Sequence, residues 1–536
     1  MIATTIFAGD ALPLTVPALL RQQAAPSTFL TCDDDRLTYE EAERRSGRLA
    51  RGLLAVGAGK GTQIGLLYPN GSDFVVGWLA AARIGAVSIP FSTFSTSAEL
   101  STLLRDADVE ILLSAGSYRS HDYLAALREV VPEFVSPPLF EGSIPALRHI
   151  FFSDDTAVDR AWTMSALVAS GEAVSDDLLR AAEDAVDASD RLVIVHTSGS
   201  TSAPKGVIHQ HGALIRHLAN LNVIRHYTPA DVLFSNSPFF WIGGFAYALL
   251  GTLLAGAHLV CSNAPKASGV LDVLERERPT MVNGYAQSVA HLPEDPTFAQ
   301  RDLSSIRRGN LYPIMPSDVR PADPQLQHQM FGMTETGSVC LVCEDESDQP
   351  EHRRGSFGRP APGFEARVVN SESGADSRMG QIGELWLRGP FLMEGYYGRE
   401  RHEVFDAEGW FHTGDLFVVD ADGFFYFRGR RGDVIKTSGA NVSPSEVETA
   451  IREATGLIAH VLGIEDAARG QVVGAAVRVP HGRELDPDEL RRLLSQRLSS
   501  YKLPRRVVLL ADEEIPTMSS GKIDVSALRE LLRAGR

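Results

Sequence analysis

The first part of the chain alternates between helix-like and strand-like patterns of hydrophobic residues. Thr38 and Glu41 have the spacing of a capping box, in which a hydroxyl and a carboxylate satisfy free N–H groups at a helix start. This predicts a helix that continues to about Val56. The same alternation then predicts a strand at 64–68, a helix at 74–84, a strand at 86–90 and a strand at 192–196. Strand–helix–strand alternation is typical of a mostly parallel sheet covered by helices.

The pattern changes twice towards the C-terminus. Residues 365–426 are rich in strand and turn signals, and Asp422-Gly423 predicts a hairpin turn. After Arg-Gly-Arg-Arg-Gly at 428–432, the pattern is that of a separate α+β unit. Its expected elements are a helix near 445–454, strands at 457–464 and 472–479, a helix at 487–498 and a strand at 507–510. We therefore predict an α/β protein with a domain boundary at the glycines flanking Arg430 and Arg431.

One stretch without charges needs its own interpretation. Residues 232–265 contain no Asp, Glu, Lys or Arg, and the segment 239–261 is long enough to cross a bilayer. Small or polar residues interrupt it: Gly243, Gly244, Gly251, Gly256 and His258. A membrane helix is the alternative, but these interruptions and the lack of a second such segment favour a helix buried in the core as a pocket wall, and no transmembrane segment.

Composition and charge narrow the range of partners. A formal charge of −17 without any dense basic stretch argues against a nucleic-acid partner. Four cysteines in 536 residues are too few for a disulfide framework. Cys340 and Cys343 form a lone C-x-x-C pair, which we expect to pack as thiols, since a zinc site would need a second pair. The N-terminus lacks a secretory pattern, so we expect a cytoplasmic protein.

The strongest chemical signal is the segment Thr-Ser-Gly-Ser-Thr-Ser-Ala-Pro-Lys-Gly at 197–206, which follows an apolar strand. Small residues let several backbone N–H groups converge on an anion, while hydroxyls and Lys205 add donors and charge. The pattern differs from the Walker P-loop but suits a polyphosphate. A bland Ser/Gly-rich surface loop is the alternative.

This loop resembles the phosphate-binding signature of the acyl-adenylate-forming superfamily, which includes acyl-CoA synthetases, firefly luciferase and nonribosomal peptide adenylation domains. Further segments resemble the other signatures of the superfamily, in the same order. They are Phe-Gly-Met-Thr-Glu-Thr at 331–336, Gly-Glu-Leu-Trp-Leu-Arg-Gly-Pro at 383–390, His-Thr-Gly-Asp-Leu at 412–416, Phe-Arg-Gly-Arg-Arg-Gly-Asp at 427–433 and Ser-Gly-Lys at 520–522. The resemblance therefore covers nearly the whole chain.

The resemblance implies an ATP-dependent carboxylic acid–CoA ligase of the acyl-CoA synthetase branch. Acid and ATP would give acyl-AMP and pyrophosphate, and coenzyme A would then give acyl-CoA and AMP, with Mg²⁺ as the metal. The alternatives are an acyl-AMP ligase that delivers to a carrier protein or an amine, a luciferase-like oxygenase, and a catalytically silent nucleotide-binding protein. Small molecules are the expected partners, and a homodimer is compatible with the sequence.

The resemblance also implies the fold. It predicts a large multi-subdomain N-terminal α/β domain with layered helices and sheets at 1–429, a hinge at 430–433, and a small mobile C-terminal α+β domain at 434–536. Rotation of this domain after adenylation would remove Lys522 and bring in 434–441. Lys436 and Gly439 would then bind CoA near its thiol. Gly432 stands at the hinge, where many members carry Asp or Lys, so a hinge charge is lost while backbone rotation stays easy.

Residue roles follow from the matching motifs. Thr334, Glu335, Lys436 and Lys522 are the implied catalytic residues. Glu335 would bind Mg²⁺, Thr334 would contact the α-phosphate, and Lys522 would bridge the acyl carboxylate and the phosphate. Phe331 would stack on adenine, Asp415 would accept the ribose hydroxyls, and Arg430 would lie at the nucleotide and domain junction. The implied ATP/AMP-binding residues are Thr197, Ser198, Gly199, Ser200, Thr201, Lys205, Gly309, Asn310, Phe331, Gly332, Thr334, Asp415, Arg430 and Lys522.

Two departures affect the nucleotide motifs. Ser202 stands where the phosphate loop often has glycine. The segment at 308–313 matches the adenine-side motif only loosely, so only Gly309 and Asn310 are assigned there.

The resemblance places the acyl pocket at Phe240, Trp241, Phe245 and Gly284. Amino-acid-activating relatives carry an aspartate early in this segment, whereas residues 232–265 have none. A buried ammonium without a partner would be costly. We therefore predict an apolar acid, namely fatty, aromatic or alicyclic. The alternative for Trp241 is simple packing in the core.

Overall fold

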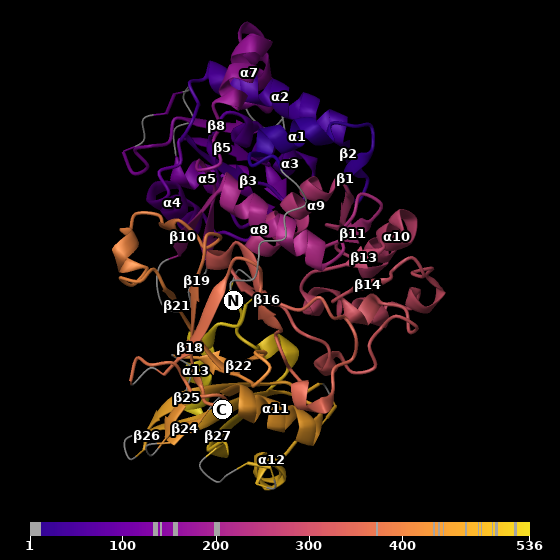
Figure 1. Cartoon of the computed structure of the whole chain (residues 1–536), viewed down its shortest axis with the longest axis vertical. Coiled ribbons are helices and arrows are strands. Elements are labelled where there is room, and N and C mark those ends of the chain that lie inside the picture. The colour runs from indigo at the N-terminus through magenta and orange to yellow at the C-terminus, as the bar shows by residue number, and fades with distance from the viewer. Residues whose placement is uncertain are drawn as a thin grey trace.

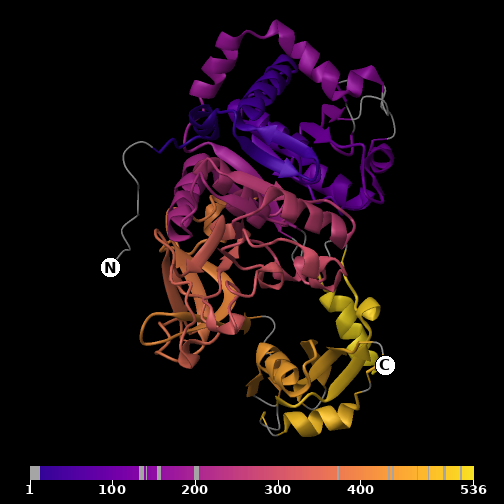
Figure 2. The ribbon, with the colours of Figure 1, turned by 90° about the vertical axis from the view of Figure 1, so that its right-hand side faces the viewer.

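The computed structural model describes residues 12–131, 138–139, 142–153, 159–197, 204–370, 373–431, 435–437, 440–442, 444–466, 469–480, 482–483, 485–495, 497–498, 502–518 and 522–535. It has the predicted mixed α/β architecture, with a large N-terminal part and a small C-terminal part. Both parts are visible in two perpendicular views, with the C-terminal part in light orange and yellow at the lower end (Figures 1 and 2).

The central sheet confirms the predicted alternation of strands and helices. Its neighbouring strands β4, β3, β5 and β8 are parallel, β9 is parallel to β4, and β10 and β20 are added antiparallel. In spatial order the strands are β20 (Gly395–Tyr396), β10 (Lys205–Gln210), β9 (Arg191–Thr197), β4 (Val87–Pro90), β3 (Gln63–Leu67), β5 (Ile111–Ser114) and β8 (His149–Phe152).

A second, mostly parallel sheet lies beside the central one. In spatial order it contains β14 (Arg308–Gly309), β13 (Met281–Val282), β11 (Val232–Phe234), β12 (His258–Cys261), β1 (Thr28–Cys32) and β2 (Asp35–Thr38). The helices of the N-terminal part are α1 (Val16–Gln23), α2 (Tyr39–Ala55), α3 (Ser72–Arg83), α4 (Ser97–Asp106), α5 (Tyr123–Val130), α6 (Met164–Ser170), α7 (Asp176–Asp184), α8 (His211–Ile224), α9 (Gly251–Ala255) and α10 (Ala267–Glu277).

Helix α2 begins as the sequence predicts. The Thr38 hydroxyl accepts a 3.1 Å hydrogen bond from the Glu41 backbone, and the Glu41 carboxylate accepts one of 3.1 Å from the Thr38 backbone. The reciprocal bonds satisfy two of the donors that a helix start leaves free.

The uncharged stretch folds into two kinds of element. A π-helix at Gly243–Leu250 continues into α9, and the chain then enters strand β12. The expected single buried helix is therefore shorter than the stretch, because its last part is a strand. Among the described residues, no helix combines the length and the apolar character needed to cross a membrane.

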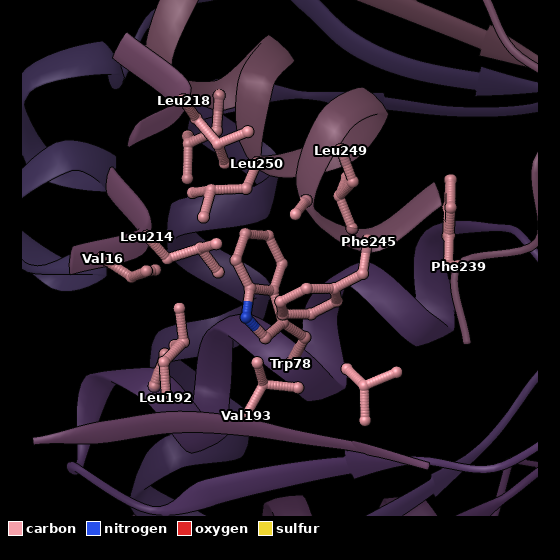
Figure 3. Close-up of a cluster of buried hydrophobic side chains, with 14 of the residues drawn as sticks. Val16, Trp78, Leu192, Val193, Leu214, Leu218, Phe239, Phe245, Leu249 and Leu250 are labelled. Carbon is pink, nitrogen blue, oxygen red and sulfur yellow. The ribbon is translucent and has the colours of Figure 1, made fainter. Parts of the chain in front are cut away.

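The main core packs around Trp78 of α3. Side chains from α8, the π-helix and β9 surround this residue (Figure 3). Trp78 is fully buried and meets Phe245 edge-on, with ring centroids 5.3 Å apart. Residues of both sheets belong to this core, and two further buried clusters lie elsewhere in the N-terminal part. Cys340 lies in this core, as expected for a packing thiol.

Strand-rich segments follow. Strands β15 (Phe331–Met333), β16 (Ser338–Val342) and β17 (Arg359–Pro360) form one small sheet, and β18 (Glu365–Val369), β19 (Gly383–Arg388), β21 (Phe411–Val419) and β22 (Phe425–Arg430) form another. The β21–β22 hairpin turns at the predicted Asp422-Gly423, where Gly423 has a φ of +81°.

The C-terminal unit matches the predicted order of elements. It contains β23 (Ile435–Thr437), β24 (Ala440–Val442), α11 (Pro444–Thr455), β25 (Ala459–Asp466), β26 (Gly470–Arg478), α12 (Pro487–Leu494), β27 (Arg506–Leu510) and α13 (Val525–Ala534). Strand β26 pairs with β23, β25 and β27. Helix α13 was not predicted, although its apolar residues Leu528 and Leu532 have helical spacing and pack against β26 and β27.

Candidate active site

Strands β9 and β10 hold the two ends of the predicted phosphate loop. They pair antiparallel, and Thr197 at the end of β9 lies opposite Lys205 at the start of β10. The loop residues Ser198, Gly199, Ser200 and Thr201 lie outside the described residues. The structure therefore places the flanks of the loop, including its lysine, at one end of the central sheet.

Tyr396 lies between Lys205 and the predicted magnesium ligand Glu335 and contacts both. Lys205 Nζ is 5.0 Å from the ring centroid of Tyr396, and the Tyr396 hydroxyl donates a 2.8 Å hydrogen bond to Glu335 Oε1. Tyr396 belongs to β20, which pairs with β10. Burial, followed by the Glu335 charge, raises the pKa of Tyr396, so its hydroxyl keeps the proton that it donates.

Thr334 and Glu335 lie on a short 3₁₀ turn, Thr334–Thr336, directly after β15. The Thr334 carbonyl lies 2.7 Å from His209 Nε2, and the Glu335 carbonyl accepts 2.9 Å from the Met393 backbone. A carbonyl can only accept, so Nε2 of His209 carries a proton. Burial lowers the pKa of His209 to about 4, so the ring is neutral at physiological pH. These contacts hold the backbone of the turn that carries the side chains of Thr334 and Glu335.

Asp415 and Arg430 face each other across the β21–β22 hairpin. They are register partners, and Arg430 Nε donates a 2.9 Å bond to Asp415 Oδ1. Asp415 is buried, whereas Arg430 is exposed. A second pair lies alongside, in which Arg431 Nη1 bonds the buried Glu384 at 3.1 Å. Both arginines at the predicted domain junction are thus held by buried carboxylates of the N-terminal part.

Lys522 comes from the far end of the chain to the predicted acid site. Its Nζ is 5.9 Å from the ring centroid of Trp241. The Lys522 carbonyl accepts a 2.7 Å hydrogen bond from the Met518 backbone, and Thr517 pairs with Ile523, so backbone contacts on both sides of residues 519–521 position the lysine. Partial desolvation, followed by the Arg430 charge, lowers the pKa of Lys522. The C-terminal part therefore contributes a cation at Trp241, and the charge of Arg430 acts on this cation.

Phe331 and Gly332 occupy β15. The Phe331 ring meets Phe417 edge-on at 4.9 Å and Phe357 at 5.9 Å, and it is half-buried. A Cβ on Gly332 would lie 2.2 Å from the Ser338 carbonyl oxygen, because β16 passes very close. The glycine at this position is therefore required by backbone packing.

Asn310 connects two strand ends of the second sheet. Its Oδ1 accepts 3.0 Å from the Gly284 backbone, and its Nδ2 donates 3.0 Å to the Gly284 carbonyl. Gly309 has a φ of +132°, and a Cβ there would lie 1.9 Å from the Val282 carbonyl oxygen. In this structure the Asn310 amide positions Gly284, while the nucleotide contact expected of Gly309 and Asn310 stays a prediction.

The predicted acyl-pocket residues separate into two groups. Phe240 and Trp241 are neighbouring rings, 5.5 Å apart, and the Lys522 ammonium lies 5.9 Å from the centroid of Trp241. Phe245 instead lies in the core against Trp78 (Figure 3). Trp241 is half-buried, so it is not a plain core residue.

A cavity of about 450 Å³ lies beside Gly309 and Asn310. Its lining also includes Leu221, Arg225, Tyr247, Met281, Asn283, Met330 and Val342. Met330 directly precedes Phe331, so this space adjoins the segment that carries Thr334 and Glu335. Arg225, Tyr247 and Tyr396 were missed from the sequence because no motif contains them; only their neighbours in space give them meaning.

Lys436 belongs to β23 in the sheet of the C-terminal unit, and Gly439 lies outside the described residues. In this arrangement Lys522 is the C-terminal lysine found at Trp241.

Family models of known proteins match both parts of the chain. The family model for the AMP-binding enzyme matches residues 20–397, and the model for the AMP-binding enzyme C-terminal domain matches residues 446–522. The chain belongs to the AMP-binding enzyme family. Within it, this AMP-binding enzyme falls in the acyl-CoA ligase class.

Two curated relatives illustrate the similarity of this AMP-binding enzyme. A feruloyl-CoA synthase from Amycolatopsis sp is 32% identical over 496 residues, which cover 91% of this chain and 92% of the relative. A putative acyl-CoA synthetase, YngI, from Bacillus subtilis is 27% identical over 507 residues, which cover 92% of each chain. The likeness extends over both parts of the molecule.

Solved structures agree on the fold. The crystal structure of ATP-bound MatB from Rhodopseudomonas palustris superimposes with a TM-score of 0.81, with 24% identity, and the match covers 98% of this AMP-binding enzyme and 100% of that chain. At this identity the likeness concerns the architecture alone, and it confirms the predicted two-part α/β fold.

Proposed function

We propose that the protein joins a carboxylic acid to coenzyme A in two steps that share one site. A carboxylate oxygen attacks the α-phosphorus of ATP, the bond to pyrophosphate breaks, and acyl-AMP results. The CoA thiol then attacks the acyl carbon, its proton is lost, and AMP leaves with the bonding electrons.

The observation that carries this proposal is the position of Lys522. The lysine comes from the C-terminal unit and lies over Trp241, on the predicted acid side. Adenylation brings a carboxylate to a polyphosphate, so a cation between the two anions is the main electrostatic requirement. Lys205, at the end of the phosphate loop, supplies a second cation.

The nucleotide contacts proposed here are those implied by the motifs. Phe331 and Gly332 would receive adenine with Gly309 and Asn310, and Asp415 would accept the ribose hydroxyls. The loop 197–201 and Thr334 would contact the phosphates. The Arg430–Asp415 pair supports this assignment because it fixes the position of a buried carboxylate at the predicted domain junction.

The donor set at Glu335 suits magnesium. The carboxylate is half-buried, and Tyr396 binds only one of its oxygens, which leaves the other for a hard cation. Bound Mg²⁺ would neutralise charge on the phosphates. The chain's own contribution is to hold Glu335 in place through Tyr396 and the Met393 backbone.

We place the second step in a different arrangement of the two parts. The proposed domains are 1–429 and 434–536, with the hinge at 430–433, of which Gly432 and Asp433 lie outside the described residues. Rotation about this hinge would withdraw Lys522 and bring Lys436 and Gly439 to the CoA thiol. Arg430 and Arg431 lie directly before Gly432 and are paired to the N-terminal part.

The acid is proposed to have an apolar body, whether fatty, aromatic or alicyclic. Phe240 and Trp241 support this, as does the absence of any charge between residues 232 and 265. Relatives named medium-chain acyl-CoA ligase, 4-coumarate-CoA ligase and feruloyl-CoA synthase are consistent with such a substrate. Binding of the acid body in the cavity beside Gly309 and Asn310 is part of the proposal.

The test is a panel of fatty, aromatic and alicyclic acids, measured for acid-dependent pyrophosphate release and for AMP release with and without CoA. We expect at least one acid to give pyrophosphate, and CoA to accelerate AMP release and yield a thioester. If acid-dependent pyrophosphate release occurs but CoA does not stimulate turnover, CoA is not the acceptor. Stimulation by a carrier protein or an amine would then identify the acceptor instead.

A further inference from the structure

The cavity beside Gly309 and Asn310 contains a buried arginine that has no obvious structural counter-charge. Arg225 follows the last residue of α8 and is 7% exposed. Its guanidinium lies between two rings, 4.6 Å from the Tyr227 centroid and 4.1 Å from the Tyr247 centroid. Among the described residues, no ion pair involves Arg225, and the contacts of its guanidinium are to neutral groups. The carboxylates of Asp318, Asp345, Glu346 and Asp348 also belong to the cavity lining.

The hydrogen bonds of Arg225 use only part of its donors. Nε and Nη2 donate to Asn222 Oδ1 at 3.1 and 2.7 Å, and Nη2 also donates to the Tyr247 carbonyl at 2.9 Å. Nη1 is buried and has no partner in the part of the chain that the structure describes. These contacts anchor α8 to the π-helix and leave one edge of the guanidinium unused.

A buried cation without an anion is expensive. Stacking on two tyrosine rings and bonding to neutral oxygens compensate only part of the lost hydration. Arg225 belongs to the cavity lining, so a ligand there that places an oxygen against this guanidinium would supply an acceptor that the described residues do not.

Two other polar groups on the same cavity lining are also under-used. Asn283 is 7% exposed, and its Oδ1 has no partner among the described residues. The Tyr247 hydroxyl donates to Met330 Sδ at 3.4 Å, and a thioether is a weak acceptor. A purely hydrocarbon ligand would leave all three groups unsatisfied inside the protein.

We propose that Arg225 is a specificity-determining residue that selects acids carrying an oxygen acceptor, a hydroxyl or a second carboxylate, at the end remote from the reacting carboxylate. This inference rests on the proposed function, in which the cavity receives the body of the acid. It narrows the substrate class from an apolar acid to an acid with an apolar middle and a polar far end.

The first experiment uses the wild-type protein and two matched sets of acids. One set is 4-methyl-, 4-hydroxy- and 4-carboxycinnamate, and the other is octanoate, 8-hydroxyoctanoate and octanedioate. Acid-dependent ATP–pyrophosphate exchange measures the first step alone. On the better scaffold, we expect an oxygen-bearing acid to exceed its hydrocarbon counterpart in kcat/KM by at least about tenfold. The better of the hydroxyl and carboxyl arms identifies the oxygen.

The second experiment uses Arg225→Met, which keeps the length of the stem, and Arg216→Met as the matched control. Arg216 lies on the same helix α8 but is not part of the cavity lining. Arg225→Met should reduce the preference for the oxygen-bearing acid to about one, mainly through KM, while exchange with the hydrocarbon acid persists. Arg225→Lys should restore part of the preference if the selected acid is the dicarboxylate. Arg216→Met should retain the wild-type ratio.

The wild-type comparison decides the matter even if Arg225→Met does not fold. A wild-type protein that uses the hydrocarbon acids as well as the oxygen-bearing ones, or that activates none of the oxygen-bearing acids, overturns the inference. So does a folded Arg225→Met protein with an unchanged preference. Failure of the proposed function has a different signature, namely selective exchange that CoA does not convert into AMP release.

Discussion

The Tyr396 hydroxyl donates a 2.8 Å hydrogen bond to Glu335 Oε1, while the ring of the same tyrosine lies 5.0 Å from Lys205 Nζ. One side chain thus connects the proposed magnesium ligand with the lysine of the phosphate loop. The pairing of β20 with β10 creates this contact, because it brings residue 396 beside the strand that begins at residue 205.

Tyr396→Phe should therefore weaken the use of Mg·ATP without unfolding the protein. Loss of a hydrogen bond to a charged group costs about 1.5 kcal/mol, so KM for Mg·ATP should rise roughly tenfold. The measurement is pyrophosphate release at varied Mg·ATP. Tyr397→Phe is the matched control, because the Tyr397 hydroxyl bonds Gln63 and Asp108 instead. Equal effects of the two substitutions would contradict the orienting role of Tyr396.

Lys522 and Lys436 should divide the two half-reactions. Lys522→Ala removes the cation at Trp241, and we expect acid-dependent pyrophosphate release to fall by about two orders of magnitude or more. Lys436→Ala should spare this step and slow thioester formation from acyl-AMP that is supplied ready-made. The assay follows each half-reaction separately, and an equal loss in both steps for either variant would refute the division.

Phe245 and Trp241 should respond differently to truncation, although both were predicted from the sequence to line the acid pocket. Phe245→Ala removes a ring packed on Trp78 in the core, so we expect a loss of about 3–5 kcal/mol in the free energy of unfolding. Trp241→Ala should cost far less stability, because the indole is only half-buried, and should change KM for the acid. Denaturant unfolding and acid titration of both variants distinguish the two roles. A destabilised Trp241→Ala with unchanged KM would place that ring in the core after all.

Acid should destabilise the protein through its buried histidines. Burial lowers the pKa of His217 to about 3, against an ordinary value of 6.5. Below pH 6.5, His217 binds a proton in the unfolded chain but stays neutral in the folded protein. The free energy of unfolding therefore falls as the pH drops towards 3. The loss for this one residue is about 1.4 kcal/mol for each pH unit.

His217→Leu should remove that contribution. Between pH 7.5 and 5.5 the wild type should lose about 1.4 kcal/mol more unfolding free energy than the variant, as measured by urea denaturation. His352→Leu, at an exposed site, is the control. The explanation fails if both variants show the pH dependence of the wild type.

Local signals in the sequence were enough for most of the elements. The Thr38–Glu41 capping box, the strand that leads into the phosphate loop and the Asp422-Gly423 turn all form as expected, because their partners lie within a few residues. The order of elements in the C-terminal unit followed for the same reason, apart from α13. The end of the uncharged stretch was misjudged, since periodicity alone does not distinguish a buried helix from a buried strand.

The sequence by itself determined the family, the two-part α/β architecture and the chemistry of the motifs, because these depend on short segments whose residues act together wherever the chain places them. Only the tertiary structure decided which groups meet: Tyr396 with Glu335, Lys522 with Trp241, Asn310 with Gly284, and Arg225 with two tyrosine rings beside a cavity. The first three of these pairs are separated by 26 to 281 positions in the chain, so sheet pairing and core packing set their distances, and no local pattern predicts them.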